Sequence, residues 1–265
     1  MLTTAIEAAK EAGKFLKQNV GKVKNIQLKG GEEKNLVTEI DKRSEEIIID
    51  IIKKHHPGHD ILAEESGAGR GQTSEFRWII DPLDGTTNFT HSFPVFCVSI
   101  GVEHKGELIA GVIYDPNFDE LFTAERGNGA FLNGKRIHVS RTDTLKRSLL
   151  VTGFPYNVTD NPDNAIEHFI QFLMESQAVR RMGSAAIDLA YVAAGRYEGF
   201  WEVALNPWDM AAGALLVTEA GGMLSDFSGN PFSVYRKQVL ATNGLVHEEM
   251  KKILTRSSAS EPPKK

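Results

Sequence analysis

Cysteine is nearly absent from this sequence: the 265 residues include one, Cys97, so no disulfide bond can form within the chain. The residue stands in the apolar stretch 95–98, where we expect it to be a small buried hydrophobic side chain. The cysteine content therefore gives no reason to assign the chain to an oxidising compartment.

Long apolar runs and targeting segments are also missing. The longest apolar stretch, residues 211–217, contains Gly213 and is far shorter than the roughly 20 residues that a membrane-spanning helix needs. The first residues lack a basic segment followed by an apolar core, so we expect no secretory signal. These absences predict a cytoplasmic protein with no membrane partner.

An excess of basic residues is missing as well. The formal net charge is −5, whereas proteins that bind nucleic acid directly usually carry a positive surplus. No direct nucleic-acid partner is therefore expected, although an acidic chain can still bind another protein. Hydrophobic residues make up 41% of the chain and charged residues 25%, which is typical of a globular protein with a sizeable core.

Hydrophobic spacing predicts a mixed chain of helices and strands. Helices are expected around residues 6–16, at 40–52, from Asn161 and Pro162 to about Glu175, at 184–194 and at 207–220. Strands are expected at 61–63, 76–80, 95–102, 108–114, 120–124, 130–132, 149–151, 197–203 and 239–241. The glycine-bearing segment 29–34 is predicted to be a loop. We expect an N-terminal α+β half at 1–145, a C-terminal α/β half at 146–256 and a disordered tail at 257–265.

Two acidic residues follow the strand expected at 76–80. Asp81 and Asp84 would lie at the carboxyl end of that strand, where open αβ sheets place their ligands. Gly85 permits an unusual backbone angle, and residues 86–88 can begin a helix whose free N–H groups attract an anion. Hard oxygen ligands beside an anion site suit magnesium together with phosphate. Taken alone, the same residues could form an ordinary Asx turn.

Two other segments offer acids in similar positions. Glu64 and Glu65 follow the short strand expected at 61–63, and Asp209 falls in the first turn of an almost wholly apolar helix. Each has a simpler interpretation, since a glutamate pair can open a solvated loop and an N-terminal acid can complement the helix dipole. Their occurrence together with Asp81 and Asp84 favours a shared metal site.

These motifs are similar to those of a known family. Residues 81–89, Asp-Pro-Leu-Asp-Gly-Thr-Thr-Asn-Phe, and residues 208–213, Trp-Asp-Met-Ala-Ala-Gly, followed by 219–222, Glu-Ala-Gly-Gly, resemble the two signatures of the inositol monophosphatase family. The resemblance runs from about residue 2 to 255 and is strongest to the bacterial inositol-1-monophosphatases. It implies a layered αβαβα sandwich of the sugar phosphatase type, which also includes fructose-1,6-bisphosphatase, and a homodimer.

The resemblance also implies a set of site residues. Glu64, Asp81 and the Leu83 carbonyl would hold one Mg²⁺, and Asp81, Asp84 and Asp209 a second. The remaining implied residues are Gly85 and Thr86 for phosphate, Asp41 to orient Thr86, and Gly183, Ser184, Ala185, Glu202 and Asp209 for the substrate.

No motif for a covalent nucleophile is present, neither a Gly-x-Ser-x-Gly elbow nor a Walker lysine loop. A metal-activated water is therefore the expected nucleophile, oriented and deprotonated by Glu64, Thr86 and Asp41 as catalytic residues. The expected activity is hydrolysis of inositol monophosphates, with lithium sensitivity.

Three alternatives remain at this point. The substrate could be fructose 1,6-bisphosphate or 3′-phosphoadenosine 5′-phosphate, because phosphatases of this fold share the metal motif. The chain could also serve a second role as a partner protein in transcription or ribosome assembly. Arg180 and Arg181 are expected to form a solvated or interface pair, with phosphate contact as the alternative.

Overall fold

The computed structural model describes residues 1–23, 26–28, 36–68 and 74–256, so the predicted loop at 29–34 and tail at 257–265 lie outside the described residues. The helices are α1 (Leu2–Asn19), α2 (Glu39–His55), α3 (Thr86–Thr90), α4 (Ala165–Glu175), α5 (Ala185–Ala193), α6 (Pro207–Glu219) and α7 (His247–Leu254), with 3-10 turns η2 (Leu145–Arg147), η3 (Val158–Asp160) and η4 (Pro162–Asn164). Within the described ranges, none of these helices has the length and apolar character to span a membrane.

The strands form two large sheets and one small pair. The eight-stranded sheet has the order β10 (Lys135–Ile137), β9 (Gly129–Leu132), β8 (Glu120–Glu125), β7 (Glu107–Asp115), β6 (Cys97–His104), β5 (Phe76–Asp84), β3 (Asp60–Ala63), β4 (Gly67–Ala68). The five-stranded sheet has the order β12 (Ala178–Arg180), β11 (Leu149–Thr152), β13 (Gly199–Val203), β15 (Gln238–Thr242), β14 (Met223–Ser225). Strands β1 (Ile26–Leu28) and β2 (Leu36–Thr38) pair with each other.

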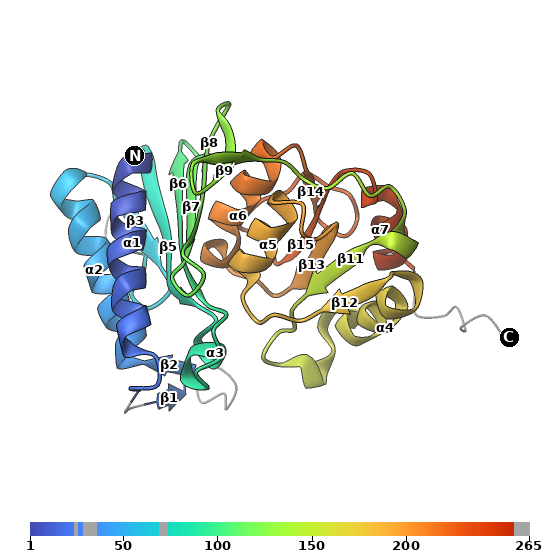
Figure 1. Ribbon diagram of the computed structural model, residues 1–265, viewed down its shortest axis with the longest axis horizontal. Coiled ribbons are helices and arrows are strands. Elements are labelled where there is room, and N and C mark those ends of the chain that lie inside the picture. Colours follow the sequence, from blue (N-terminus) through green and yellow to red (C-terminus); the bar gives the residue numbers. More distant parts are fainter. Residues whose placement is uncertain (24–25, 29–35, 69–73, 257–265) are drawn as a thin grey trace, which may run out of the picture.

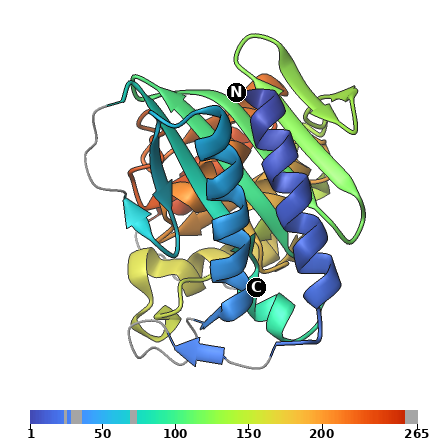
Figure 2. The ribbon, with the colours of Figure 1, turned by 90° about the vertical axis from the view of Figure 1, so that its left-hand side faces the viewer.

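Helices and sheets alternate in five layers, as Figure 1 shows from left to right. Helices α1 and α2 cover the outer face of the eight-stranded sheet (Figure 2) and share a core with Trp78 and Ile80. Helices α5 and α6 lie between the sheets, in a core that includes Ile79 and Phe200. Helices α4 and α7 cover the far face of the five-stranded sheet. The predicted αβαβα order is therefore confirmed.

A pair of glycines brings α6 unusually close to the large sheet. Gly101 of β6 and Gly111 of β7 face each other in register. A Cβ atom at Gly101 would lie 2.6 Å from the Cβ of Ala211, and one at Gly111 would lie 2.9 Å from the Ala212 carbonyl oxygen. Any side chain at either strand position would therefore push the helix away. This close packing holds α6 against β6 and β7.

Most expected elements occur where the sequence predicts them, with two differences. Strand β5 continues past Ile80 as far as Asp84. Helix α4 begins at Ala165 rather than at the predicted Asn161 cap, because Asn161 and Asn164 adopt the left-handed conformation and interrupt the helix. The Asn161 side chain still accepts a hydrogen bond from the Ile166 amide at 2.9 Å. The boundary between the two halves at 145 and 146 stays a prediction.

Candidate active site

Strand β5 carries two carboxylates to one side despite their odd spacing. On a regular strand, residues three apart point to opposite faces. Here the pairing with β6 shifts between Asp81, opposite Ser99, and Asp84, opposite Cys97, so β5 holds one extra residue. Such a bulge re-aims side chains. Both acids consequently line the same cavity.

Helix α2 holds the neighbouring turn that presents Glu64. The buried carboxylate of Glu45 accepts hydrogen bonds from the amides of Glu65 at 2.8 Å and Ser66 at 2.9 Å. The Glu64 amide donates to the Ile80 carbonyl at 3.1 Å, which places Glu64 beside the end of β5. The Ser44 hydroxyl donates to the Pro82 carbonyl at 2.8 Å, so one helix fixes both chain segments.

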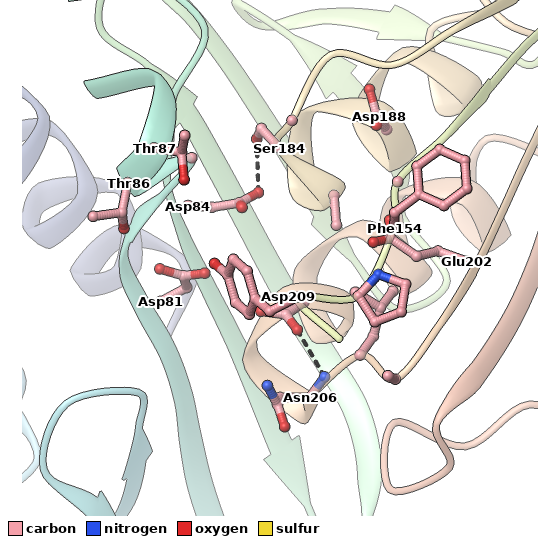
Figure 3. A pocket seen from close by; sticks show the side chains of 18 of the residues that line it. Asp81, Asp84, Thr86, Thr87, Phe154, Ser184, Asp188, Glu202, Asn206 and Asp209 are labelled. Carbon is pink, nitrogen blue, oxygen red and sulfur yellow. Dashed lines mark hydrogen bonds between the residues drawn. The ribbon is translucent and has the colours of Figure 1, made fainter. Parts of the chain in front are cut away.

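The first turns of α5 and α6, in the C-terminal half of the chain, lie at the same cavity. Asp84 Oδ2 accepts hydrogen bonds from the Ser184 hydroxyl at 2.6 Å and the Ala186 amide at 2.7 Å, both at the start of α5. At the start of α6, Asp209 Oδ2 accepts from the Asn206 amide at 2.7 Å and completes a capping box. Figure 3 shows Asp81, Asp84 and Asp209 around one open space.

The site lies in a cavity of about 390 Å³ between the two sheets. Eleven of the twelve site residues predicted from the sequence line it: Glu64, Asp81, Leu83, Asp84, Gly85, Thr86, Gly183, Ser184, Ala185, Glu202 and Asp209. The twelfth, Asp41, lies directly behind Thr86, whose hydroxyl is 3.0 Å from Asp41 Oδ1 and 3.1 Å from the Leu83 carbonyl oxygen. The structure thus brings the whole predicted set together.

Asp41 is held rigidly although it does not face the cavity. Its Oδ2 atom accepts hydrogen bonds from both the backbone amide and the hydroxyl of Thr38 in the capping box that begins α2. Burial raises the pKa of Asp41, while the hydrogen bonds from Thr38 and Thr86 act in the opposite direction. The Thr86 hydroxyl therefore has a fixed acceptor on its protein side.

The carboxylates destabilise one another's charged form. Burial raises the pKa of Asp81 well above its ordinary value, and the charges of Glu64, Asp84 and Asp209 raise it further. Burial raises the pKa of Asp84 to about 6, although hydrogen bonds from Ser184 and Ala186 favour its ionised form. The pKa of Asp209 is also raised well above its ordinary value, first by burial and then by Glu64. A cation between these groups would relieve this repulsion.

The donor set suits a hard divalent cation such as magnesium. It consists of carboxylate oxygens and one accessible carbonyl, with no thiolate or imidazole in the lining. Among residues 1–23, 26–28, 36–68 and 74–256, no three acidic, histidine or cysteine side chains enclose an ion by themselves. The proposed ligands would therefore need waters and the substrate phosphate to complete the coordination, as is common for magnesium.

The backbone beside the acids is shaped for close approach. Gly85 has φ +96°, a left-handed conformation that favours glycine. A Cβ atom there would lie 2.9 Å from the Val95 carbonyl oxygen, so space also excludes a side chain. Residue Thr86 follows as the first residue of α3. Gly85 and Thr86 both line the cavity, next to Asp84 in the chain.

Comparisons with known proteins agree with this arrangement. Residues 1–261 match the model of the inositol monophosphatase family. The chain belongs to this family. It is 49% identical to an inositol-1-monophosphatase of Synechocystis sp. over 253 residues, covering 96% of this chain and 88% of the relative. It is 45% identical to a Nus factor SuhB of Pseudomonas aeruginosa over 247 residues, covering 92% of this chain and 91% of the relative.

Solved structures of family members have the same fold. The inositol monophosphatase from Anabaena superposes with a TM-score of 0.86 and is 44% identical, covering 96% of this chain and 94% of that chain. Membership of the inositol monophosphatase family confirms the prediction that the chain is a phosphatase. Such enzymes are generally metal-dependent and act on small phosphorylated substrates.

Several residues that line the cavity were not predicted as site residues from the sequence. Arg180 and Arg181 are both exposed, as expected of a solvated pair, but Arg181 also lines the cavity, a position that the sequence did not indicate. Asp188 also lines the cavity and was not predicted at all. One signal was available, since Asp188 is the only charged residue in the apolar segment 185–193. The aromatic residues Phe154, Tyr156 and Trp208 complete the wall.

Proposed function

We propose that this protein hydrolyses inositol monophosphates, inositol 1-phosphate among them, to inositol and phosphate, with Mg²⁺ as its cofactor. We further propose that it works as a cytoplasmic homodimer. The observation that carries the proposal is the meeting of four acids, Glu64, Asp81, Asp84 and Asp209, with the Thr86 and Asp41 pair in and behind one cavity.

The acids divide into two overlapping ligand sets in this proposal. Glu64, Asp81 and the Leu83 carbonyl would hold one ion, and Asp81, Asp84 and Asp209 the other. Bound magnesium would supply Lewis-acid polarisation of the phosphate and activation of a water molecule. Asp81 would be a ligand of both ions. Its burial agrees with this central place, because only 2% of its surface is exposed.

Thr86 has the geometry to orient the attacking water. Its hydroxyl carries one hydrogen, and Asp41 Oδ1 and the Leu83 carbonyl both lie within hydrogen-bond distance of it. Because that hydrogen is directed into the protein, the lone pairs of the oxygen remain to accept a hydrogen from water in the cavity. Glu64 would assist in removing the proton as the new P–O bond forms.

The remaining lining residues would position the ester. Backbone N–H groups of Gly85 and Thr86 would bind phosphate oxygens, and Gly183, Ser184, Ala185 and Glu202 would contact the polyol. Asp84 and Asp209 would hold the cation whose charge stabilises the leaving oxygen. The old P–O bond breaks as this oxygen leaves and takes a proton from water, with no phosphate attached to the protein at any stage. Trapping of labelled phosphate on the denatured protein would contradict this sequence.

The substrate assignment is tested by a panel. Phosphate release would be measured with saturating magnesium from inositol 1-phosphate, fructose 1,6-bisphosphate and 3′-phosphoadenosine 5′-phosphate. We expect the highest kcat/KM for inositol 1-phosphate. A higher kcat/KM for another substrate would contradict the substrate assignment but not the metal-dependent mechanism. No phosphate release from any of the three would refute the proposed activity.

A second candidate function rests on the names of relatives. Several relatives, including the one from Pseudomonas aeruginosa at 45% identity, are named Nus factor SuhB. We propose that this chain also binds a protein of the transcription machinery. Co-elution with RNA polymerase components in gel filtration would support this role. Separate elution at low salt, where charge interactions are strongest, would contradict it.

A further inference from the structure

Asp188 is a buried acid that the mechanism above does not use. It lies in the first turn of α5, where it lines the cavity with only 1% of its surface exposed. Its Oδ1 atom is buried and has no hydrogen-bond partner among the described residues. Leaving such a group unsatisfied usually costs about 1–3 kcal/mol of folding free energy. Its neighbours in the helix are apolar, so packing alone would be served better by leucine.

The surroundings of Asp188 separate it from the acids proposed for the metal. Figure 3 shows Asp188 and Glu202 on the side of the cavity near Phe154, away from Asp81 and Thr86. Burial raises the pKa of Asp188 well above its ordinary value, the charges of Glu202 and Asp84 add to this effect, and Arg181 opposes it. Glu202, in turn, fits beneath Gly153, where a Cβ atom would lie 2.3 Å from both of its carboxyl oxygens.

We propose that Asp188 is a specificity-determining residue that forms a hydrogen bond with a hydroxyl group of the substrate's ring, beside the contact made by Glu202. A hydroxyl group both donates and accepts, so it satisfies the unpartnered oxygen whether or not the carboxyl group carries a proton. A substrate that lacks the hydroxyl leaves that oxygen unsatisfied in the bound state. This inference rests on the proposed phosphatase function and names the feature of the ring that the site selects.

The test compares two phosphate esters with rings of the same size. Inositol 1-phosphate carries ring hydroxyls, and cyclohexyl phosphate has none. With saturating magnesium, we expect wild type to prefer inositol 1-phosphate in kcat/KM. Asp188→Leu should reduce that preference about 10- to 100-fold, through a higher KM for inositol 1-phosphate and little change for cyclohexyl phosphate. Asp188→Asn, which keeps a hydrogen-bonding group, should retain most of the preference.

The controls separate this role from a structural one. Asp188→Leu should unfold at the same temperature as wild type or a higher one, because it removes an unsatisfied buried group. Glu198→Gln alters another buried acid, one that accepts from the Leu149 amide at 2.6 Å outside the cavity lining, and should leave the preference unchanged. Should Asp188→Leu fail to fold, Asp188→Ala would take its place.

Two results would overturn the inference while leaving the phosphatase function intact. One is a preference in folded Asp188→Leu within twofold of wild type. The other is equal hydrolysis of both esters by wild type. If wild type hydrolysed neither ester in magnesium, the proposed function and this inference would fall together.

Discussion

The Ser184 hydroxyl donates a hydrogen bond to Asp84 across 2.6 Å and thereby joins the start of α5 to the end of β5. The Ala186 amide donates to the same carboxylate oxygen, so two donors at the start of α5 hold Asp84. Because both bonds converge on Oδ2, its second oxygen, Oδ1, is available to a cation. The two halves of the chain therefore meet at a residue proposed to bind magnesium.

Loss of this link should weaken magnesium binding. In Ser184→Ala, Asp84 loses the shortest of its hydrogen bonds, so its orientation is less fixed and its ionised form is less favoured. We expect the magnesium concentration for half-maximal phosphate release to rise about tenfold. Ser176→Ala serves as control, because it removes a hydroxyl that donates to the Phe172 carbonyl at the end of α4, and neither residue lines the cavity. Equal magnesium requirements in both variants would contradict the link.

Gly85→Ala should abolish most activity and destabilise the fold. The position combines φ +96° with a contact of 2.9 Å between the added Cβ and the Val95 carbonyl oxygen. We expect a loss of about 1–3 kcal/mol in the free energy of unfolding. Gly106→Ala is a matched control, since its φ is +81° but nothing lies within 4 Å of the added atom. Measured denaturation curves should show a larger loss for Gly85→Ala.

The hydroxyl of Thr86 should matter more than its methyl group. Thr86→Val removes the hydrogen bond to Asp41 while keeping the shape, and we expect kcat to fall about 100-fold or more. Thr86→Ser keeps the hydroxyl and should restore most of that loss. Thr90→Val removes an exposed hydroxyl that bonds within α3 and should have little effect. Steady-state kinetics that fail to separate Thr86→Val from Thr86→Ser would argue against the proposed role.

Glu202 predicts how stability changes with pH when metal is absent. Burial raises its pKa from 4.5 to about 8, so the folded state binds its proton more tightly than the unfolded chain does. Its contribution to stability is therefore full below about pH 4.5 and is lost as the pH rises through about 8. In chelator, thermal unfolding of Glu202→Gln should depend less on pH across this window than that of wild type. A steeper dependence in the variant would contradict the sign.

Local sequence patterns predicted the elements that carry the site. The strand, turn and helix around Asp81 and Asp84 follow from short-range propensities, as does the helix that begins near Asp209. Spacing along the chain could not place Asp209 beside Glu64 and Asp84, because Asp209 lies on α6 whereas the other two follow neighbouring strands of the eight-stranded sheet. The joint occurrence of these acids already favoured a shared metal site, and the resemblance to the family assigned each of them a role.

The features that the sequence did not predict depend on tertiary structure. Strands β4, β12 and β14 have two or three residues each, too few for a periodic pattern. The extension of β5 to Asp84 includes a bulge, which is set by pairing with β6. The position of Asp188 in the cavity wall depends on how α5 packs between the sheets. Such properties arise only when distant segments assemble.

Lithium should inhibit the enzyme if the sites are as proposed. A small monovalent cation can occupy a magnesium site without supplying the same charge, so phosphate release should fall in roughly tens of millimolar lithium chloride. Potassium chloride at the same concentration controls for ionic strength. Equal activity in the two salts would contradict the predicted lithium sensitivity.

The most direct test of the central claim is a magnesium titration of phosphate release from inositol 1-phosphate, with wild type and Asp84→Asn assayed side by side. Wild type should be inactive in chelator and should regain full activity when magnesium is returned. Asp84→Asn, while folded, should lose about 100-fold or more in kcat/KM. Release by wild type that persists unchanged in chelator, or equal rates in the two proteins, would contradict a metal-dependent phosphatase built on these carboxylates.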